Sequence, residues 1–291
     1  MFEQILVPLD GSPLAEQALP IAQAIAGPNQ TKLILFRVVP FFTVLAADPL
    51  LYEEMNRMGE DEAVAYLRGV RESLPPEIAA ETACDTGSAA DAILGFARDQ
   101  GVDLIVMSSH GRSGVNRWVY GSIAERILSQ APCPTLIINS NQPPWTDTAD
   151  ALLVPLDGSE LAEKALGPAK EIADRLGLTM HLLRVTTAES VRREAEVVLE
   201  KLSSLQSQEG DEAHTYLEAI CGQLEGNDVT CVVEEAGHSV AETIIDYALR
   251  NGIDLIVMST HGRTGIRRWV YGSVAEKVLR SGCCATMTIR D

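Results

Sequence analysis

Two stretches of this sequence carry residues suited to holding an anion. The first, SSHGRSGVNRWVYGS, covers residues 108–122, and the second, STHGRTGIRRWVYGS, covers residues 259–273. Their glycines allow close approach of the backbone to a ligand, and consecutive backbone N–H groups can then form a concave anion site. Each stretch ends in Gly-Ser before a predicted helix, whose positive dipole end favours phosphate. Arg112 and Arg263 add charge that does not titrate away. The two stretches therefore predict phosphate sites.

A purely structural role for the final serines is the alternative. Ser122 and Ser273 are each followed three residues later by Glu, which is the signature of a capping box. A similar pattern, with an acidic residue three positions later, begins at Ser88 (Asp91) and Ser239 (Glu242), where no glycine-rich stretch precedes it. The serines alone therefore predict only the start of a helix. We favour phosphate binding because glycines and arginines accompany them.

The charge of the chain narrows the class of its partners. Its 291 residues have a net charge of −18, which repels nucleic-acid backbones and anionic membranes. No uncharged apolar run reaches the roughly 20 residues that span a bilayer. The N-terminal residues lack the basic flank of a signal peptide. We therefore expect a cytoplasmic protein that binds neither nucleic acid nor a membrane.

Familiar catalytic motifs are missing from the sequence. It has no Walker-type P-loop, no G-x-G-x-x-G fingerprint, no H-E-x-x-H and no G-x-S-x-G. His110 and His261 have no accompanying nucleophile or metal ligand, so we interpret them as structural. The vicinal Cys283 and Cys284 could form a redox site, but packing beside the last strand is the favoured interpretation. The sequence predicts binding rather than catalysis.

The chain is one unit written twice. Positions 103–128 and 254–279 align without a gap, and 19 of these 26 positions are identical. LVPLDGS also occurs in each half, as does DEA followed by a YL pair. The polar, proline-containing segment between the halves is typical of a linker. We therefore predict a first domain at 1–140, a linker at 141–150 and a second domain at 151–291.

Within each half, short apolar runs alternate with helical patterns. Residues 5–9 predict a strand, 12–26 predict one helix, and 61–74 lie in a further helix. This pattern predicts, in each half, an open doubly wound parallel sheet of five strands with helices on both faces. Ligands bind such sheets at the carboxyl ends of strands, where the strand order reverses. Asp10 and Asp157 follow the first strand of each half, where they could contact a ligand or support the next helix.

Taken together, the motifs resemble those of the universal stress protein family in its tandem two-domain form. The resemblance covers both halves and depends on VPLDGS, on MSSHGR…YGS and MSTHGR…YGS, and on APCPTLII. It implies an adenine nucleotide alpha-hydrolase-like fold and, for some members, ATP binding. ATP-binding members have a loop of the form Gly, two residues, Gly, nine residues, Gly-Ser or Gly-Thr. This chain has Ser108 and Ser259 at the first position.

The resemblance also implies residue roles. Aspartate would meet the adenosine, the end of the second strand would offer backbone contacts to adenine, and the glycines and serines would hold phosphate. Contact of the two arginines with phosphate is inferred from their charge. The nucleotide-binding residues expected in the first half are Pro8, Asp10, Val38, Met107, Ser108, Gly111, Arg112, Gly121, Ser122 and Ile123. Those expected in the second half are Pro155, Asp157, Val185, Met258, Ser259, Gly262, Arg263, Gly272, Ser273 and Val274.

The resulting hypothesis is an ATP-binding stress-response sensor or regulator with one pocket per half. Mg²⁺ would accompany the phosphates, and no other metal is expected. An interaction module that does not bind nucleotide and a slow ATPase are the alternatives. Family members dimerise through their last strands, so residues 134–139 and 285–290 would pair within the chain as an internal pseudo-dimer. A further homodimer and protein partners stay open.

Overall fold

The computed structural model describes residues 2–40, 49–109, 121–139, 145–146, 148–187, 212–224, 228–260 and 272–290. The chain forms two compact units, Met1–Thr146 and Asp147–Asp291. The boundary between them falls within the predicted linker.

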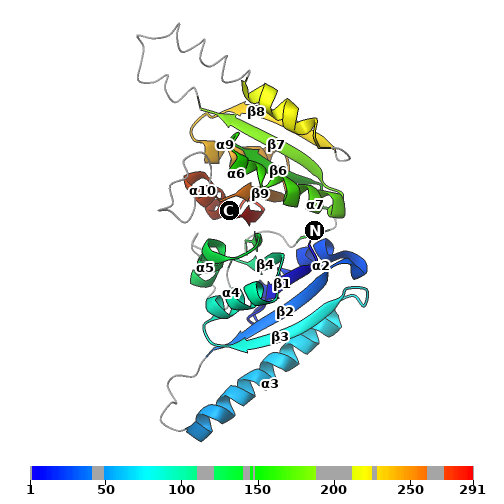
Figure 1. Cartoon of the computed structure of the whole chain (residues 1–291), viewed down its shortest axis with the longest axis vertical. Helices are drawn as coiled ribbons and strands as arrows, with labels where there is room; N and C mark the ends of the chain where they lie inside the picture. The colour runs from blue at the N-terminus through cyan, green and yellow to red at the C-terminus, as the bar shows by residue number, and fades with distance from the viewer. Residues whose placement is uncertain are drawn as a thin grey trace. The chain divides into compact units, whose positions relative to one another are not determined.

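In the first unit, strands and helices alternate along the chain (Figure 1). The elements are β1 (Gln4–Pro8), α1 (Pro13–Glu16), α2 (Leu19–Gln30), β2 (Lys32–Val39), α3 (Pro49–Ser73), β3 (Ala80–Thr86), α4 (Ala89–Asp99), β4 (Leu104–Ser108), α5 (Ser122–Gln130) and β5 (Thr135–Ile138).

The second unit repeats this order. Its elements are β6 (Ala151–Leu156), α6 (Glu160–Glu163), α7 (Leu166–Leu176), β7 (Thr179–Thr186), a helix over 212–221, β8 (Val229–Glu235), α9 (Val240–Arg250), β9 (Leu255–Ser259), α10 (Ser273–Ser281) and β10 (Ala285–Ile289).

Each unit contains an open parallel sheet of five strands, as predicted. The strand order is β3-β2-β1-β4-β5 in the first unit and β10-β9-β6-β7-β8 in the second. β1 pairs in parallel with β2 on one side and with β4 on the other. The chain therefore leaves β1 in one direction and returns on its other side at β4, so the order reverses between these two strands. The predicted pairing of β5 with β10 stays a prediction.

Helices cover both faces of each sheet. α2 packs on β1 and β2, α3 packs on β2 and β3, and α4 packs on β2 and β3 and against α5. Right-handed crossovers place α2 and α3 on one face, and α4 and α5 on the other. The central residues Ile5, Leu6 and Val7 of β1 are accordingly fully buried. The outer strands β3 and β8 are more exposed and carry several acidic side chains, which discourage pairing with another chain.

The helix predicted over 12–26 is wrong as a single helix. The structure has two helices there, α1 and α2, separated by a short turn. An unbroken helix would need a backbone N–H at Pro20 to donate to the carbonyl of Glu16, and proline has none. Pro168 has the same relation to Lys164, and α6 and α7 are separated in the same way.

Two of the cysteines form a disulfide. Cys221 in the helix over 212–221 is bonded to Cys231 in β8, a pairing that the sequence pattern does not indicate. Burial, the main cause, raises the pKa of Cys133 to about 12. Cys283 differs, because a hydrogen bond with Cys284 lowers its pKa to about 6 against the opposing effect of burial.

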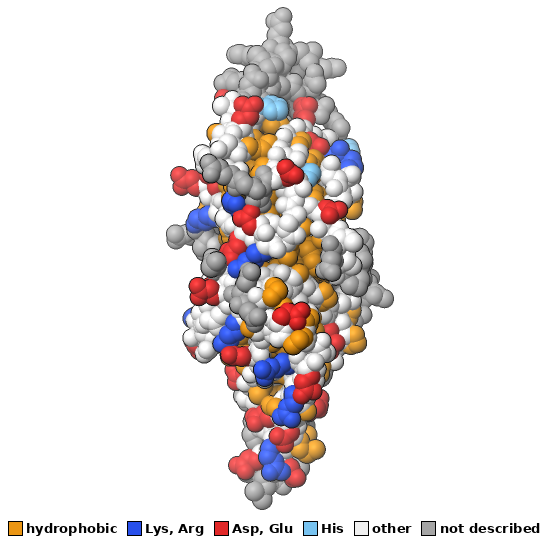
Figure 2. All heavy atoms as spheres, turned by 90° about the vertical axis from the view of Figure 1, so that its right-hand side faces the viewer, with side chains coloured by type: hydrophobic (Ala, Val, Ile, Leu, Met, Phe, Trp, Pro, Cys, Tyr) orange, Lys and Arg blue, Asp and Glu red, His pale blue; other side chains and the backbone are white. Residues whose placement is uncertain are grey.

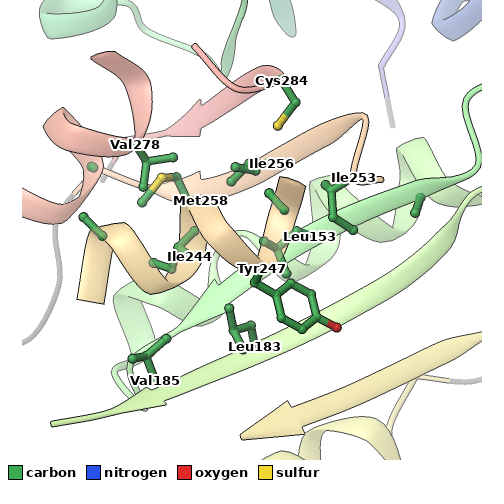
Figure 3. Close-up of a cluster of buried hydrophobic side chains, with 14 of the residues drawn as sticks. Leu153, Leu183, Val185, Ile244, Tyr247, Ile253, Ile256, Met258, Val278 and Cys284 are labelled. Carbon is green, nitrogen blue, oxygen red and sulfur yellow. The ribbon is translucent and has the colours of Figure 1, made fainter. Parts of the chain in front are cut away.

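A polar contact lies at one side of the apolar core of the second unit. Figure 3 shows the ring of Tyr247 projecting from α9 near Leu183, with its hydroxyl directed away from the apolar cluster. This hydroxyl lies 2.8 Å from Nδ1 of His181 in β7. Arg250 and Glu234 form an ion pair close by, with Arg250 5.9 Å from the centre of the Tyr247 ring. Burial lowers the pKa of His181.

The surface is mixed in charge. On the face drawn in Figure 2, acidic and basic side chains are interspersed with apolar ones. No helix within the described ranges is both long enough and apolar enough to cross a membrane.

We predict that the Cys221–Cys231 disulfide stabilises the second unit. Its removal frees a short loop in the unfolded chain and should lower the free energy of unfolding by about 2–3 kcal/mol. Urea unfolding with and without dithiothreitol measures this difference. A Cys221→Ser/Cys231→Ser variant is the control, because reductant should not shift its unfolding. An equal effect of reductant on both proteins would contradict the assignment.

We also predict a pH dependence that originates at His181. Because its pKa is lower in the folded state, the unfolded chain binds the proton more tightly. The free energy of unfolding should therefore be highest above a pH of about 6.5, the pKa of histidine in the unfolded chain, and should decrease as the pH falls below it. Urea midpoints at mildly acidic and neutral pH, in the wild type and in His181→Gln, measure this contribution. Identical pH dependence in the two proteins would contradict it.

Candidate functional site

The turn that follows β1 is organised by one carboxylate. Oδ1 of Asp10 accepts hydrogen bonds from the backbone N–H of Ser12 at 2.9 Å and from its hydroxyl at 2.6 Å. The Ser12 hydroxyl oxygen in turn accepts from the N–H of Ala15 at 3.2 Å and caps α1. Gly11, between them, has φ of +86°, which glycine adopts without strain. Asp10 therefore supports the start of α1, one of the two roles predicted for it, and its contact with a ligand stays a prediction.

The second unit contains the same turn after β6. Oδ1 of Asp157 accepts from the N–H and the hydroxyl of Ser159 at 3.0 and 2.5 Å, and the Ser159 hydroxyl oxygen caps α6 at Ala162. The repeat of these contacts in both halves shows that the turn belongs to the duplicated design.

Helix packing brings this turn to the end of the fourth strand. α1 contacts β4, and α6 contacts β9. Pro8 ends β1, and Pro155 is the penultimate residue of β6. Met107 and Ser108 end β4, and Met258 and Ser259 end β9. The two motifs of each half therefore meet at the carboxyl edge of the sheet, where the strand order reverses. This is the position that the sequence predicted for a ligand.

A backbone hydrogen bond returns the chain from the glycine-rich stretch to this edge. The N–H of Gly121 donates to the carbonyl of Ser109 at 3.2 Å, and the N–H of Gly272 donates to that of Thr260 at 2.8 Å. A Cβ atom at Gly121 would lie 3.6 Å from the Ser109 oxygen, and one at Gly272 would lie 3.3 Å from the Thr260 oxygen. α5 and α10 therefore begin directly beside the ends of β4 and β9.

The capping-box interpretation of Ser122 and Ser273 is wrong. Both serines are the first residues of their helices, and the N-cap positions are Gly121 and Gly272, which make no side-chain cap. Ser239 shows the contrast, because its hydroxyl oxygen caps α9 by accepting from the N–H of Glu242. The first turns of α5 and α10, which also contain Ile123 and Val274, lack a side-chain cap and suit an external anion.

Serine is compatible with the first position of the predicted loop pattern. Ser108 and Ser259 are strand residues with extended backbone, so neither position needs the positive φ that would favour glycine.

The predicted adenine contacts lie at the ends of the second strands. Phe36 of β2 directs its backbone groups toward β1, because its carbonyl accepts from Leu9 at 2.7 Å. Backbone direction alternates along a strand, so the N–H and C=O of Val38 point to the same side, beyond the end of β1. Val185 is placed in the same way, since the carbonyl of Thr186 points toward β8. The backbone groups of Val38 and Val185 therefore point toward the first strand of their unit, at the carboxyl edge where the Asp10 and Asp157 turns begin.

Four predicted site residues lie outside the described residues. They are Gly111, Arg112, Gly262 and Arg263. The histidines at 110 and 261 lie outside them as well.

A partly buried polar network beside the first turn was missed by the sequence analysis. The hydroxyl of Tyr66 in α3 donates to Glu16 of α1 at 2.8 Å. The guanidinium of Arg37, a buried residue in β2, lies 4.8 Å from the centre of the Tyr66 ring and pairs with Glu62 at 3.0 Å. Burial first, and then Glu16, raise the pKa of Tyr66, and the charge of Asp10 adds to this. The network joins α1, α3 and β2 next to the Asp10 turn.

The second unit has an equivalent network. The hydroxyl of Tyr216 donates to Glu163 of α6 at 3.0 Å. Buried Arg184 donates to the carbonyl of Leu156 at 3.3 Å, and its charge and that of Asp157 both act on Tyr216. The repeated YL pair after DEA was the sequence signal for both tyrosines, but a repeat does not show which side chain it meets.

We predict that the Tyr66–Glu16 hydrogen bond stabilises the position of α1. Tyr66→Phe removes the donor and should lower the free energy of unfolding by about 1 kcal/mol. A double-mutant cycle with Glu16→Gln, measured by urea unfolding, isolates this contact. Tyr216→Phe with Glu163→Gln provides the matched cycle in the other half. Additive single effects in both cycles would contradict the prediction.

Comparison with known proteins identifies the family. The model of the universal stress protein family matches residues 1–139 and again 149–290. A curated relative, universal stress protein YxiE of Bacillus subtilis, is 29% identical over 147 residues, which cover 47% of this chain and 99% of the relative.

Two solved structures extend over both halves. A universal stress protein from Archaeoglobus fulgidus covers 99% of this chain and 98% of its own, with a TM-score of 0.64 and 19% identity. A putative universal stress protein from Pseudomonas aeruginosa covers 99% and 93%, with a TM-score of 0.65 and 19% identity. At this identity the structures show the fold, which is the tandem fold predicted. Together with the double match to the family model, they show that the chain belongs to the universal stress protein family, with one domain of that family in each half.

Proposed function

We propose that the protein binds ATP or a related adenine nucleotide, one molecule per unit, and acts as a sensor or regulator in stress responses. One observation carries the proposal. In both units, a helix with no side-chain cap follows an N-cap glycine whose N–H is hydrogen-bonded to the carbonyl just after the fourth strand, beside the aspartate turn. The phosphates would lie at the start of α5 or α10, where backbone N–H groups and the helix dipole favour negative charge.

The adenosine end would lie toward the second strand. The backbone of Val38 in one unit, and of Val185 in the other, points to the side of the sheet edge where the aspartate turn begins. Adenine presents hydrogen-bond donors and acceptors along its edge. The N–H and C=O groups of a strand that extends past the end of its neighbouring strand can pair with them. Pro8 and Pro155, at the ends of the first strands, would border the same space.

Mg²⁺ would be held mainly by the phosphates. Within the described residues, no group of three or more His, Cys, Asp or Glu side chains gathers around a common point. Mg²⁺ usually keeps several water ligands and binds through one or two carboxylates together with substrate phosphates, so it would enter with the nucleotide.

The proposal is for binding and not for turnover. The aspartate nearest the edge in each unit directs one carboxylate oxygen at the next serine, through two hydrogen bonds. These hydrogen bonds are typical of an aspartate that shapes a turn, whereas a general base would direct its carboxylate at a water molecule. We also propose a cytoplasmic location, where ATP is available.

We predict that Gly121→Asp and Gly272→Asp each remove one nucleotide site. Aspartate is a favourable N-cap residue, and the φ of Gly121 is −59° and that of Gly272 is −64°, so the helices should still form. The added carboxylate would repel phosphate, and the affinity should fall by at least about tenfold. Calorimetric titration of nucleotide-stripped protein with MgATP measures stoichiometry and affinity.

Gly121→Asn and Gly272→Asn are the matched controls, since asparagine has the same size and capping ability without the charge. A stoichiometry near two in the wild type, near one in each Asp variant, and a smaller effect of Asn is the expected pattern. If the wild type binds no nucleotide, or if both Asp variants bind as it does, the proposal fails. The fold would then serve interaction with another protein.

A further inference from the structure

The second unit differs from the first at the turn between its last helix and its last strand. α10 is followed by Gly282, which has φ of +58° and lets the chain reverse, and then by Cys283 and Cys284. The corresponding residues of the first unit are Pro132 and Cys133, so only the second unit has two adjacent thiols.

The two sulfur atoms lie on the same side of this turn. Sγ of Cys283 is 3.7 Å from Sγ of Cys284. The N–H of Cys283 donates to the Ser281 hydroxyl oxygen at 3.4 Å, and that hydroxyl donates to the carbonyl of Val278 at 2.6 Å. On the other side, the N–H of Ala285 donates to the carbonyl of Asp254 at 3.2 Å. Hydrogen bonds therefore hold the chain on both sides of the pair.

The sulfur separation matches a chelate. With metal–sulfur bonds of about 2.3 Å, two sulfurs 3.7 Å apart subtend about 107° at the metal, close to the tetrahedral angle. Thiolates select soft cations such as Zn²⁺ and Cu⁺. Cys284 is 8% exposed, whereas Cys283 is only half-buried, so the outer sulfur can be reached from solvent. Figure 3 shows Cys284 at the margin of the apolar cluster, next to Ile256.

The local charge also favours a cation. The Asp254 carboxylate acts electrostatically on Cys284. It accepts hydrogen bonds from the N–H groups of Asp150 and Ala151 at 2.9 and 3.2 Å, which keeps it in place. A cation bound by both sulfurs would be attracted to this carboxylate.

We propose that Cys283 and Cys284 chelate one soft, thiophilic cation of the Zn²⁺, Cd²⁺ or Cu⁺ type. Two bonds form between the metal and the two sulfurs, the protons of the thiols pass to the buffer, and no electron is transferred. Water or a small-molecule ligand completes the coordination. The site lies at the amino end of β10, whereas the proposed nucleotide site lies at the carboxyl edge of the same sheet. The inference is therefore independent of the proposed function.

Cd²⁺ is the probe, because its bonds to thiolate absorb in the ultraviolet. The full chain, with the Cys221–Cys231 disulfide intact and metals removed, would be titrated anaerobically with Cd²⁺. We expect thiolate absorption that saturates at one Cd²⁺ per chain. Cys283→Ser and Cys284→Ser should each weaken binding at least about tenfold, since loss of a direct ligand costs no less than loss of an outer contact. Cys133→Ser, at the counterpart of Cys284, is the matched control and should bind as the wild type does.

Thermal unfolding is the second measurement, because a ligand of the folded state must stabilise it. Cd²⁺ should raise the unfolding temperature of the wild type and of Cys133→Ser but not that of the other two variants. The unfolding of each variant without Cd²⁺ shows that it is folded. Undiminished Cd²⁺ binding in either Cys283→Ser or Cys284→Ser would overturn the proposal, as would a wild type that shows no thiolate absorption.

Discussion

The site in each half depends on one backbone hydrogen bond. The N–H of Gly121 reaches the carbonyl of Ser109, and the N–H of Gly272 reaches that of Thr260. Because the bond joins main-chain groups, it fixes where the following helix begins whatever side chains lie between its ends. A Cβ atom at Gly121 would make an ordinary contact with the Ser109 oxygen at 3.6 Å, whereas one at Gly272 would be tight against the Thr260 oxygen at 3.3 Å. The parallel pairing of the first and fourth strands then places the aspartate turn beside that helix.

A comparison of the two halves shows which features of the carboxyl edge are kept and which features of the core vary. Both halves keep the aspartate turn, the tyrosine–glutamate hydrogen bond and a buried arginine in the second strand. The cores nevertheless differ. In the first half the rings of Phe36 and Phe96 pack with their centres 4.6 Å apart, whereas the second half has the polar His181–Tyr247 contact. Several combinations of side chains can fill the same volume in a core. A set of directional hydrogen bonds at one edge of the sheet requires particular side chains.

The sequence predicted those features that depend on local pattern. Apolar runs indicated the strands, so the five-stranded parallel sheets with helices on both faces were predicted correctly. The break between α1 and α2 was missed because apolar spacing continues across it, although Pro20 marked it. The cap of α5 was misassigned because a Ser-x-x-Glu pattern is the same whether serine or the preceding glycine occupies the N-cap. The Tyr66–Glu16 contact and the Cys221–Cys231 bond could not be predicted, since each joins elements whose spacing depends on tertiary packing.

The two edges of each sheet have different tasks. At the amino edge of the first unit, the carboxylate of Asp103 accepts from the N–H groups of Glu3 and Gln4, each at 2.9 Å, and Asp254 does the same in the second unit. These bonds hold the start of the first strand against the start of the fourth. Ligands bind such folds at the carboxyl edge of the sheet. Substitutions at the amino edge can therefore occur without altering the ligand site. A second cysteine at this edge, present in one half only, is therefore a difference between the halves that the shared site does not explain.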